Sequence, residues 1–231
     1  LPRRTRGSGS CAMADRRDIV RERDVIANGI RLRVREQGAH GASVPSLLLL
    51  HGINDRWESW EPVISALAAR YHVIAPDLRG HARSDKPDDG YALADYAADA
   101  AGLLDALNVG RVCVIGHSLG ALIAAYLAAE MPDRVHALVL EDPPLCQHAD
   151  IDEWARLRVE AQGLNTAEQT AAMLRDLVPD RPDADIEQEA EWLRATAQGP
   201  FIAILTGEID LTSDQSAMLR RIACPTLVLQ A

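Results

Sequence analysis

Short apolar runs alternate with segments of helical spacing along most of this sequence, an order typical of strands that alternate with helices. The runs lie at residues 46–51, 72–75, 111–115 and 135–140, and the helical segments lie at 61–70, 93–107 and 119–130. Because parallel strands need crossover connections, this order predicts an α/β fold with a mainly parallel sheet and helices on both of its faces. Asn28-Gly29, between two alternating runs, predicts a β-hairpin that adds antiparallel strands at one edge.

The pattern changes after residue 146. Residues 147–219 are helix-like and acidic, with glycine and proline interruptions, and an apolar strand returns only at 226–230. An all-helical insert between two strands of one sheet predicts a lid over the sheet edge. The predicted organisation is a disordered tail at 1–18, an α/β core at 19–146, a helical lid or cap at 147–221 and a return strand of the core at 222–231.

Charge is distributed unevenly along the chain. Residues 150–214 contain 15 acidic residues and 5 arginines, which alone account for the net charge of −10 of the whole sequence. Such a field repels phosphate backbones and disfavours nucleic acid as a partner. No apolar run approaches the roughly 20 residues that a membrane span needs. The four cysteines are far apart, which favours neither a metal site nor a disulfide framework, and we expect a cytoplasmic protein.

The decisive motif is Gly116-His117-Ser118-Leu119-Gly120, which follows a buried strand and opens a helix. A serine in this context is typical of a nucleophile elbow, where a tight turn exposes the hydroxyl at the carboxyl edge of the sheet. Gly116 and Gly120 fit the turn because the strand and the helix approach too closely there for side chains. We therefore predict Ser118 as a catalytic nucleophile.

A second motif, His51-Gly52, ends the apolar run at 46–51. Acyl transfer needs two preorganised donors for the oxyanion, and we expect the backbone N–H groups of Leu119 and Ile53 to supply them. We interpret His51, and likewise His117, as a residue that supports its loop and does not act as the base. Trp57, together with Trp60, is predicted to line the substrate pocket.

His51-Gly52, the loop at 77–85 (Asp-Leu-Arg-Gly-His-Ala-Arg-Ser-Asp) and the elbow, in this order, resemble the α/β-hydrolase superfamily. The similar branch holds esterases, lactonases, carbon–carbon bond hydrolases and cofactor-free haloperoxidases, and the resemblance covers residues 25–231. Ala82 departs from the glycine that relatives usually carry. Ser118 also stands where haloalkane dehalogenases and epoxide hydrolases have aspartate, so those two chemistries are disfavoured.

The resemblance implies a mechanism in which Ser118 attacks an acyl carbon while a histidine takes its proton, with no metal and no organic cofactor. In the family the histidine follows the last strand, whereas the last histidine here is His148, at the start of the predicted lid. We therefore expect a reading frame that is partial at both ends, with the catalytic histidine beyond Ala231. Asp142 is a possible acid, although an Asp-Pro pair after that strand is also common for structural reasons. Asp210 precedes the last strand and belongs to the lid.

Three functions remain open at this point. The leading one is a serine hydrolase that cleaves a small ester, lactone or related carbonyl compound. A cofactor-free haloperoxidase or perhydrolase would use the same elbow with peroxide in place of water. A catalytically inactive fragment, or a small-molecule binding module, would follow from the missing histidine. The oligomeric state and the identity of the substrate are not predicted.

Overall fold

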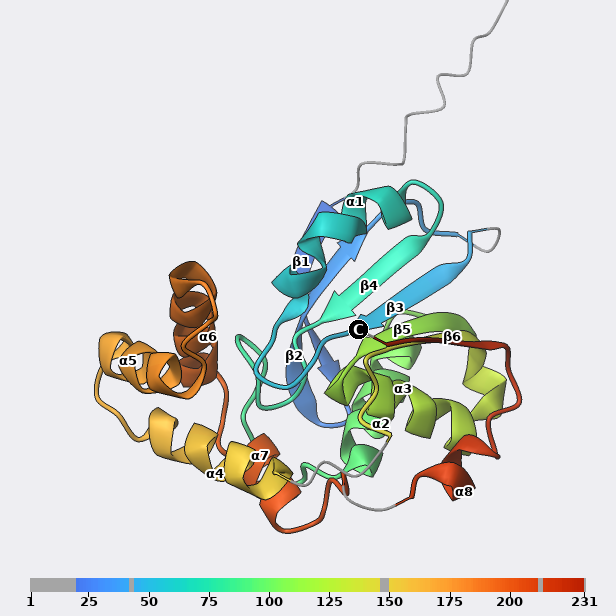
Figure 1. The fold of residues 1–231 in the computed structure, drawn as a ribbon. Coiled ribbons are helices and arrows are strands. Elements are labelled where there is room, and N and C mark those ends of the chain that lie inside the picture. Colours follow the sequence, from blue (N-terminus) through green and yellow to red (C-terminus); the bar gives the residue numbers. More distant parts are fainter. Residues whose placement is uncertain (1–19, 42–43, 146–149, 212–213, 231) are drawn as a thin grey trace, which may run out of the picture.

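The computed structural model describes residues 20–41, 44–145, 150–211 and 214–230. The predicted tail at 1–18 and the predicted boundary at 146/147 lie outside them. Within these residues, seven strands form one sheet in the order β1-β2-β4-β3-β5-β6-β7 (Figure 1). The strands are β1 (Val20–Ala27), β2 (Ile30–Gln37), β3 (Ser46–Leu50), β4 (His72–Pro76), β5 (Val112–His117), β6 (Val135–Glu141) and β7 (Thr226–Leu229).

The sheet is mixed, with its antiparallel part at one edge. β1 and β2 form the hairpin expected from Asn28-Gly29, and both turn residues have positive φ, 48° and 79°. β2 pairs antiparallel with β4, and all further pairings, from β4 through β3, β5 and β6 to β7, are parallel. The predicted α/β fold is confirmed, and the parallel strands place their carboxyl ends at one common edge.

Helices cover both faces of the sheet because the inner strands are apolar on both sides. Leu48 and Leu50 pack with α2 (Leu93–Ala106) and α3 (Leu119–Glu130) in the larger core. Leu47 and Leu49 point the other way and pack with α1 (Glu61–Ala68) in a second cluster. This division follows from the two-residue period of a strand, which turns successive side chains to opposite faces.

The insert between β6 and β7 is helical, as the sequence predicts. Its helices are α4 (Ile151–Gln162), α5 (Ala167–Leu177), α6 (Asp183–Ala195), α7 (Gly199–Leu205) and the short α8 (Ser216–Leu219). α4 to α7 gather beside the sheet, with α5 and α6 farthest from it (Figure 1). Ala171, Leu174, Ile186 and Ala190 give the α5–α6 hairpin a small core of its own, separate from the two clusters at the sheet.

Specific contacts attach the insert to the α/β core. The Ala197 N–H donates to the Gly80 carbonyl at 2.6 Å, at the junction between α6 and α7. Gly199 lies against the Tyr91 ring so closely that an added Cβ would be 2.1 Å from a ring carbon. Trp154 of α4 meets Phe201 of α7 with ring centroids 5.8 Å apart. Across the described part of the chain, no helix combines the length and apolar character required to cross a bilayer.

Candidate active site

Ser118 lies in the one-residue turn between β5 and α3. Its backbone has φ 49° and ψ −113°, a region that L side chains rarely adopt, and its N–H donates to the Glu141 carbonyl at 3.0 Å. The side chain is half-buried and lines two cavities. The strand–turn–helix context of the predicted elbow is therefore present, and the serine hydroxyl is accessible at the carboxyl edge of the sheet.

Gly116 and Gly120 make this turn possible by allowing backbone to approach backbone. A Cβ added to Gly116 would lie 2.2 Å from the Gly120 carbonyl oxygen. A Cβ on Gly120 would lie 2.0 Å from the carbonyl oxygen of Leu50 in β3. Both distances are far inside van der Waals contact, so neither position accepts a side chain unless the backbone moves.

The loop after β3 places the backbone of Ile53 at the cavities beside Ser118. The Asp55 N–H donates to the Gly52 carbonyl at 3.2 Å, which closes a tight turn with Asn54 at φ 66°. Ile53, inside this turn, lines the same two cavities as Ser118. Among the described residues, the N–H groups of Ile53 and Leu119 have no hydrogen-bond acceptor. They are therefore available to an oxyanion formed above Ser118.

His51 supports this loop from beneath. Its Nε2 accepts a hydrogen bond from the Leu78 N–H at 2.9 Å, and its Nδ1 donates to the Gly52 carbonyl at 2.7 Å. Burial lowers the pKa of His51, and burial also lowers the pKa of the neighbouring His81 to about 3. Since both ring nitrogens of His51 are engaged in one neutral tautomer, the ring fixes the loop and has no free nitrogen for a proton from Ser118.

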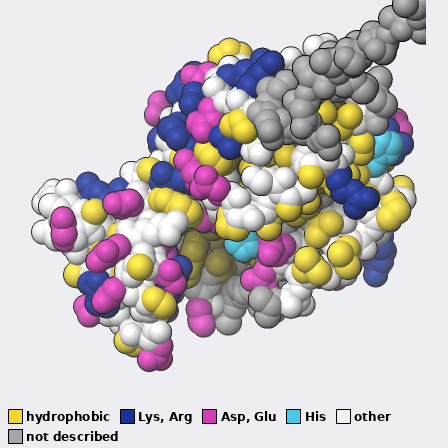
Figure 2. All heavy atoms as spheres, turned by 90° about the horizontal axis from the view of Figure 1, so that it is seen from above, with side chains coloured by type: hydrophobic (Ala, Val, Ile, Leu, Met, Phe, Trp, Pro, Cys, Tyr) yellow, Lys and Arg dark blue, Asp and Glu magenta, His cyan; other side chains and the backbone are white. Residues whose placement is uncertain are grey.

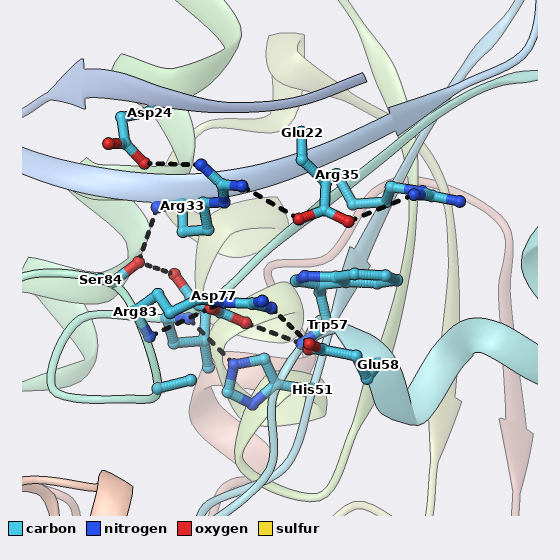
Figure 3. A network of polar contacts seen from close by, with 12 residues as sticks. Glu22, Asp24, Arg33, Arg35, His51, Trp57, Glu58, Asp77, Arg83 and Ser84 are labelled. Carbon is cyan, nitrogen blue, oxygen red and sulfur yellow. Dashed lines mark hydrogen bonds and ion pairs between the residues drawn. The ribbon is translucent and has the colours of Figure 1, made fainter. Parts of the chain in front are cut away.

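Trp57 is buried away from the cavities, and the prediction that it lines the substrate pocket is wrong. Its ring is 4% exposed and packs with Trp60, Leu47 and Leu49 on the α1 face of the sheet. Its backbone N–H donates to the buried Asp77 carboxylate at 2.9 Å (Figure 3). A tryptophan just after the loop suggests a pocket wall, but the 3₁₀ turn at Trp57–Trp60 directs both rings into the core.

Asp77 organises the loop at 77–85 from its buried position. One carboxylate oxygen accepts from the Trp57 N–H and the other from the Arg83 N–H, and the Asp77 carbonyl accepts from the Ser84 hydroxyl at 2.6 Å (Figure 3). The Ser84 hydroxyl in turn accepts from the Arg33 N–H of β2 at 2.9 Å. This network ties the two loops beneath the site to each other and to the sheet.

His117 contacts the loop after β3 from the side of the turn at Ser118. Its Nδ1 lies 3.6 Å from the Asp55 carboxylate, and the Asp55 carboxylate raises the pKa of His117. A Cβ on Gly52 would lie 2.8 Å from the same nitrogen, so the loop packs closely against the ring. His117 therefore joins the elbow to the loop that carries Ile53.

Two cavities meet at Ser118, one apolar and one polar. The first has a volume of about 450 Å³ and is lined by Ile53, Ser118, Leu119, Asp142, Pro143, Pro144, Leu145, Ile151, Trp154, Ile204, Ile209, Leu211, Val228 and Gln230. The second has a volume of about 590 Å³ and is lined by Ile53, Asn54, Asp55, His117, Ser118, Asp142, Trp154, Arg158, Arg181, Asp185, Gln188, Glu189 and Trp192. Figure 2 shows a hollow between the projecting helical insert and the body of the molecule, with charged side chains of both signs on the insert.

The insert residues at these cavities were not predicted from the sequence. Trp154 lines both cavities, and Arg158 and Trp192 line the polar one. One sequence signal could have identified Arg158: it is three residues from both Ala155 and Ala161, which places it on the buried face of α4. In the described part of the chain, no three His, Cys, Asp or Glu side chains are grouped closely enough to hold a metal ion.

Asp142 follows β6 and lines both cavities together with Ser118. Its φ is 44°, and its N–H donates to the Leu229 carbonyl of β7 at 2.8 Å. Its carboxylate is close enough to His117 to contribute to the raised pKa of that ring, although less than Asp55. The position is compatible with a catalytic acid, and the choice between that role and a structural one stays a prediction.

The profile of the α/β hydrolase fold family matches residues 45–229. A curated relative, 2-(acetamidomethylene)succinate hydrolase of Mesorhizobium japonicum, is 37% identical over 171 residues, which are 73% of this chain and 60% of the relative. An epoxide hydrolase of Caballeronia sordidicola is 37% identical over 142 residues, 60% of this chain and 42% of the relative. The solved N-formylmaleamic acid deformylase of Pseudomonas putida S16 has a TM-score of 0.69 at 28% identity, covering 90% of this chain and 81% of its own. The chain thus spans at most 60% of the length of these two curated relatives.

Proposed function

This chain belongs to the α/β-hydrolase family, and we propose that it is a serine hydrolase that cleaves a small ester, lactone or related carbonyl compound through an acyl-enzyme. The observation that carries the proposal is Ser118 at φ 49° between β5 and α3, facing two cavities. The serine at this position supports acyl chemistry over epoxide opening, although an epoxide hydrolase is among the relatives.

The proposed reaction has two halves. The Ser118 oxygen attacks the carbonyl carbon, and the N–H groups of Ile53 and Leu119 hold the negative charge that develops on the carbonyl oxygen. The leaving group departs with a proton and an acyl-serine remains. Water then attacks the acyl carbon with loss of a proton, and Ser118 regains its hydrogen as the acid is released.

The proton acceptor is proposed to be a histidine. In the described residues no histidine ring forms a hydrogen bond with the Ser118 hydroxyl, so we assign this role to a histidine outside them. The carboxyl end of β7 is a suitable entry point, because the Leu229 carbonyl is bonded to Asp142 and Val228 lines the apolar cavity. Asp142, which lines both cavities together with Ser118, is the acid that we propose to orient this histidine.

The names of two relatives support small carbonyl compounds as substrates. One acts on 2-(acetamidomethylene)succinate and the other on N-formylmaleamic acid. The two cavities at Ser118, of about 450 and 590 Å³, each lie in the size range of small-molecule sites.

The test is covalent labelling of the natural full-length protein, which includes the proposed histidine, with a fluorophosphonate probe, read by intact-mass spectrometry and peptide mapping. We expect one adduct, on Ser118, in the wild-type protein. Ser118→Ala should abolish it, whereas Ser65→Ala, which changes an exposed serine of α1, should leave it unchanged. A folded wild-type protein that takes no label at Ser118, or takes it equally after Ser118→Ala, would refute the proposal.

A further inference from the structure

Arg158 is an unusual group to find beside a nucleophile in a helical insert. It lies on α4, its side chain is only 10% exposed, and it lines the polar cavity that also contains Ser118. Arginine is almost never this buried unless its charge is compensated. The groups that contact Arg158 therefore show how far its positive charge and its N–H donors are satisfied.

Two groups hold the Arg158 guanidinium in place. Its Nη2 donates to one carboxylate oxygen of Glu189 on α6 at 3.0 Å, and the guanidinium carbon lies 4.6 Å above the centre of the Trp154 ring. Its Nε is buried and has no hydrogen-bond partner among the described residues. The planar group is thus fixed in orientation, while part of its donor set remains unused.

Glu189 does not neutralise Arg158 alone, because it is shared. Its other carboxylate oxygen accepts a hydrogen bond from Arg181, so one negative charge serves two guanidinium groups. Burial lowers the pKa of Arg158, which records the cost of holding this charge away from water. A second anion beside Arg158 would reduce that cost.

The other carboxylates at the polar cavity are placed differently. Asp55 faces His117, Asp185 is solvent-exposed on α6, and Asp142 stands at the end of β6 beside the elbow. None of the three forms a hydrogen bond or ion pair with Arg158 in the described structure. Together with Glu189, these carboxylates outnumber the two arginines of the cavity, but the three leave Arg158 with the shared Glu189 as its only carboxylate partner among the described residues.

We propose that Arg158 binds a carboxylate of the substrate while Ser118 attacks a carbonyl of the same molecule. This inference rests on the proposed function and names the substrate class: small carbonyl compounds that carry a free carboxylate. A carboxylate matches the guanidinium because two parallel N–H donors meet two oxygens in one plane. The apolar cavity on the other side of Ser118 then receives the uncharged part of the substrate.

The experiment measures binding, which does not depend on turnover. Isothermal titration calorimetry, with every protein carrying Ser118→Ala so that neither ester is cleaved, compares monomethyl succinate, which has one carboxylate and one ester, with the uncharged dimethyl succinate. We expect the Ser118→Ala protein to bind the monoester at least about 10-fold more tightly, the smaller end of what a charged hydrogen bond contributes. Arg158→Gln should remove this preference, and Arg175→Gln, which changes an exposed arginine of α5, should keep it.

A variant with the opposite sign separates binding from misfolding. Glu189→Gln keeps a hydrogen-bond acceptor for Arg158 but removes the competing charge, so monomethyl succinate should bind more tightly than to the Ser118→Ala parent. Loss of structure cannot produce tighter binding. Equal affinity for the two esters, no binding of either, or unchanged binding after Arg158→Gln would overturn the proposal. Because labelling of Ser118 is a separate measurement, a failed carboxylate site and a failed serine hydrolase give different results.

Discussion

Gly120→Ala tests whether the elbow depends on direct backbone contact between α3 and β3. The substitution adds one methyl group, and that carbon would lie 2.0 Å from the Leu50 carbonyl oxygen and 2.7 Å from the His51 carbonyl oxygen. Both obstacles are backbone atoms of an inner strand and its exit, so rotation of a side chain cannot relieve the overlap. The helix must move away from the strand by at least 1 Å to reach the 3.0 Å that real Cβ contacts respect.

The expected cost follows from two opposing effects. Overpacking of a close contact costs about 1–3 kcal/mol, and rigid backbone on both sides favours the upper end of that range. The change from glycine to alanine in a helix returns up to about 1 kcal/mol. The net loss is therefore about 2 kcal/mol, which corresponds to a fall in Tm of about 4–8 °C for a protein of this size. A shift of the Leu119 N–H by about 1 Å should also slow fluorophosphonate labelling of Ser118, by up to about 100-fold.

Thermal unfolding followed by circular dichroism, with labelling rates measured well below the transition, checks both effects. Gly110→Ala is the matched control, because a Cβ at Gly110 meets nothing within 4 Å. We expect the control to unfold and label like the wild type. If Gly120→Ala matched the Gly110→Ala control in both Tm and labelling rate, the close approach of α3 to β3 would not be what shapes the elbow.

Two further substitutions test the surroundings of the site. Asp55→Asn should lower the pKa of His117, which the Asp55 carboxylate raises above 6.5, and NMR titration of the ring measures this. A histidine whose pKa is raised in the folded state stabilises the fold below its unfolded pKa, and this stabilisation is lost as the pH rises through the folded pKa. Asp55→Asn should therefore lower the free energy of unfolding at about pH 5, and this loss should shrink towards pH 8. A loss of stability that grows with pH would contradict the interaction between Asp55 and His117. Trp57→Ala should reduce the free energy of unfolding in urea by about 3–5 kcal/mol while folded molecules still label at Ser118, because the ring is core and not pocket wall. Loss of labelling without a loss of stability would instead indicate that Trp57 lines the pocket.

The sequence predicted the elements whose patterns are dictated locally. The apolar run at 46–51 required burial on both faces, and Gly116 and Gly120 around Ser118 required a turn without side chains, so β3 and the elbow context were confirmed. Asn28-Gly29 likewise determined the hairpin. In each case a few adjacent residues contain the physical cause, and no distant contact is needed to choose the structure.

Features that depend on distant packing were not predictable. Helical spacing indicated that α4 exists, but it could not show that Trp154 and Arg158 face Ser118, because that depends on how the insert docks on the sheet. Trp57 was misassigned for the same reason, since the 3₁₀ turn that directs it into the core is stabilised by Asp77, twenty residues away. His51 was interpreted as a loop support, and the hydrogen bond from Leu78 gives the physical reason.

The separate core of the α5–α6 hairpin has a consequence for how this protein can change over evolution. Its four buried residues belong to neither cluster of the sheet, so replacements at those four positions act on local packing, whereas Leu193 of the same hairpin belongs to the larger core. Yet Glu189 and Trp192, on the same hairpin, form part of the wall opposite Ser118. Substitutions in this hairpin can therefore change the wall opposite Ser118 while β5, α3 and the turn between them keep their sequence.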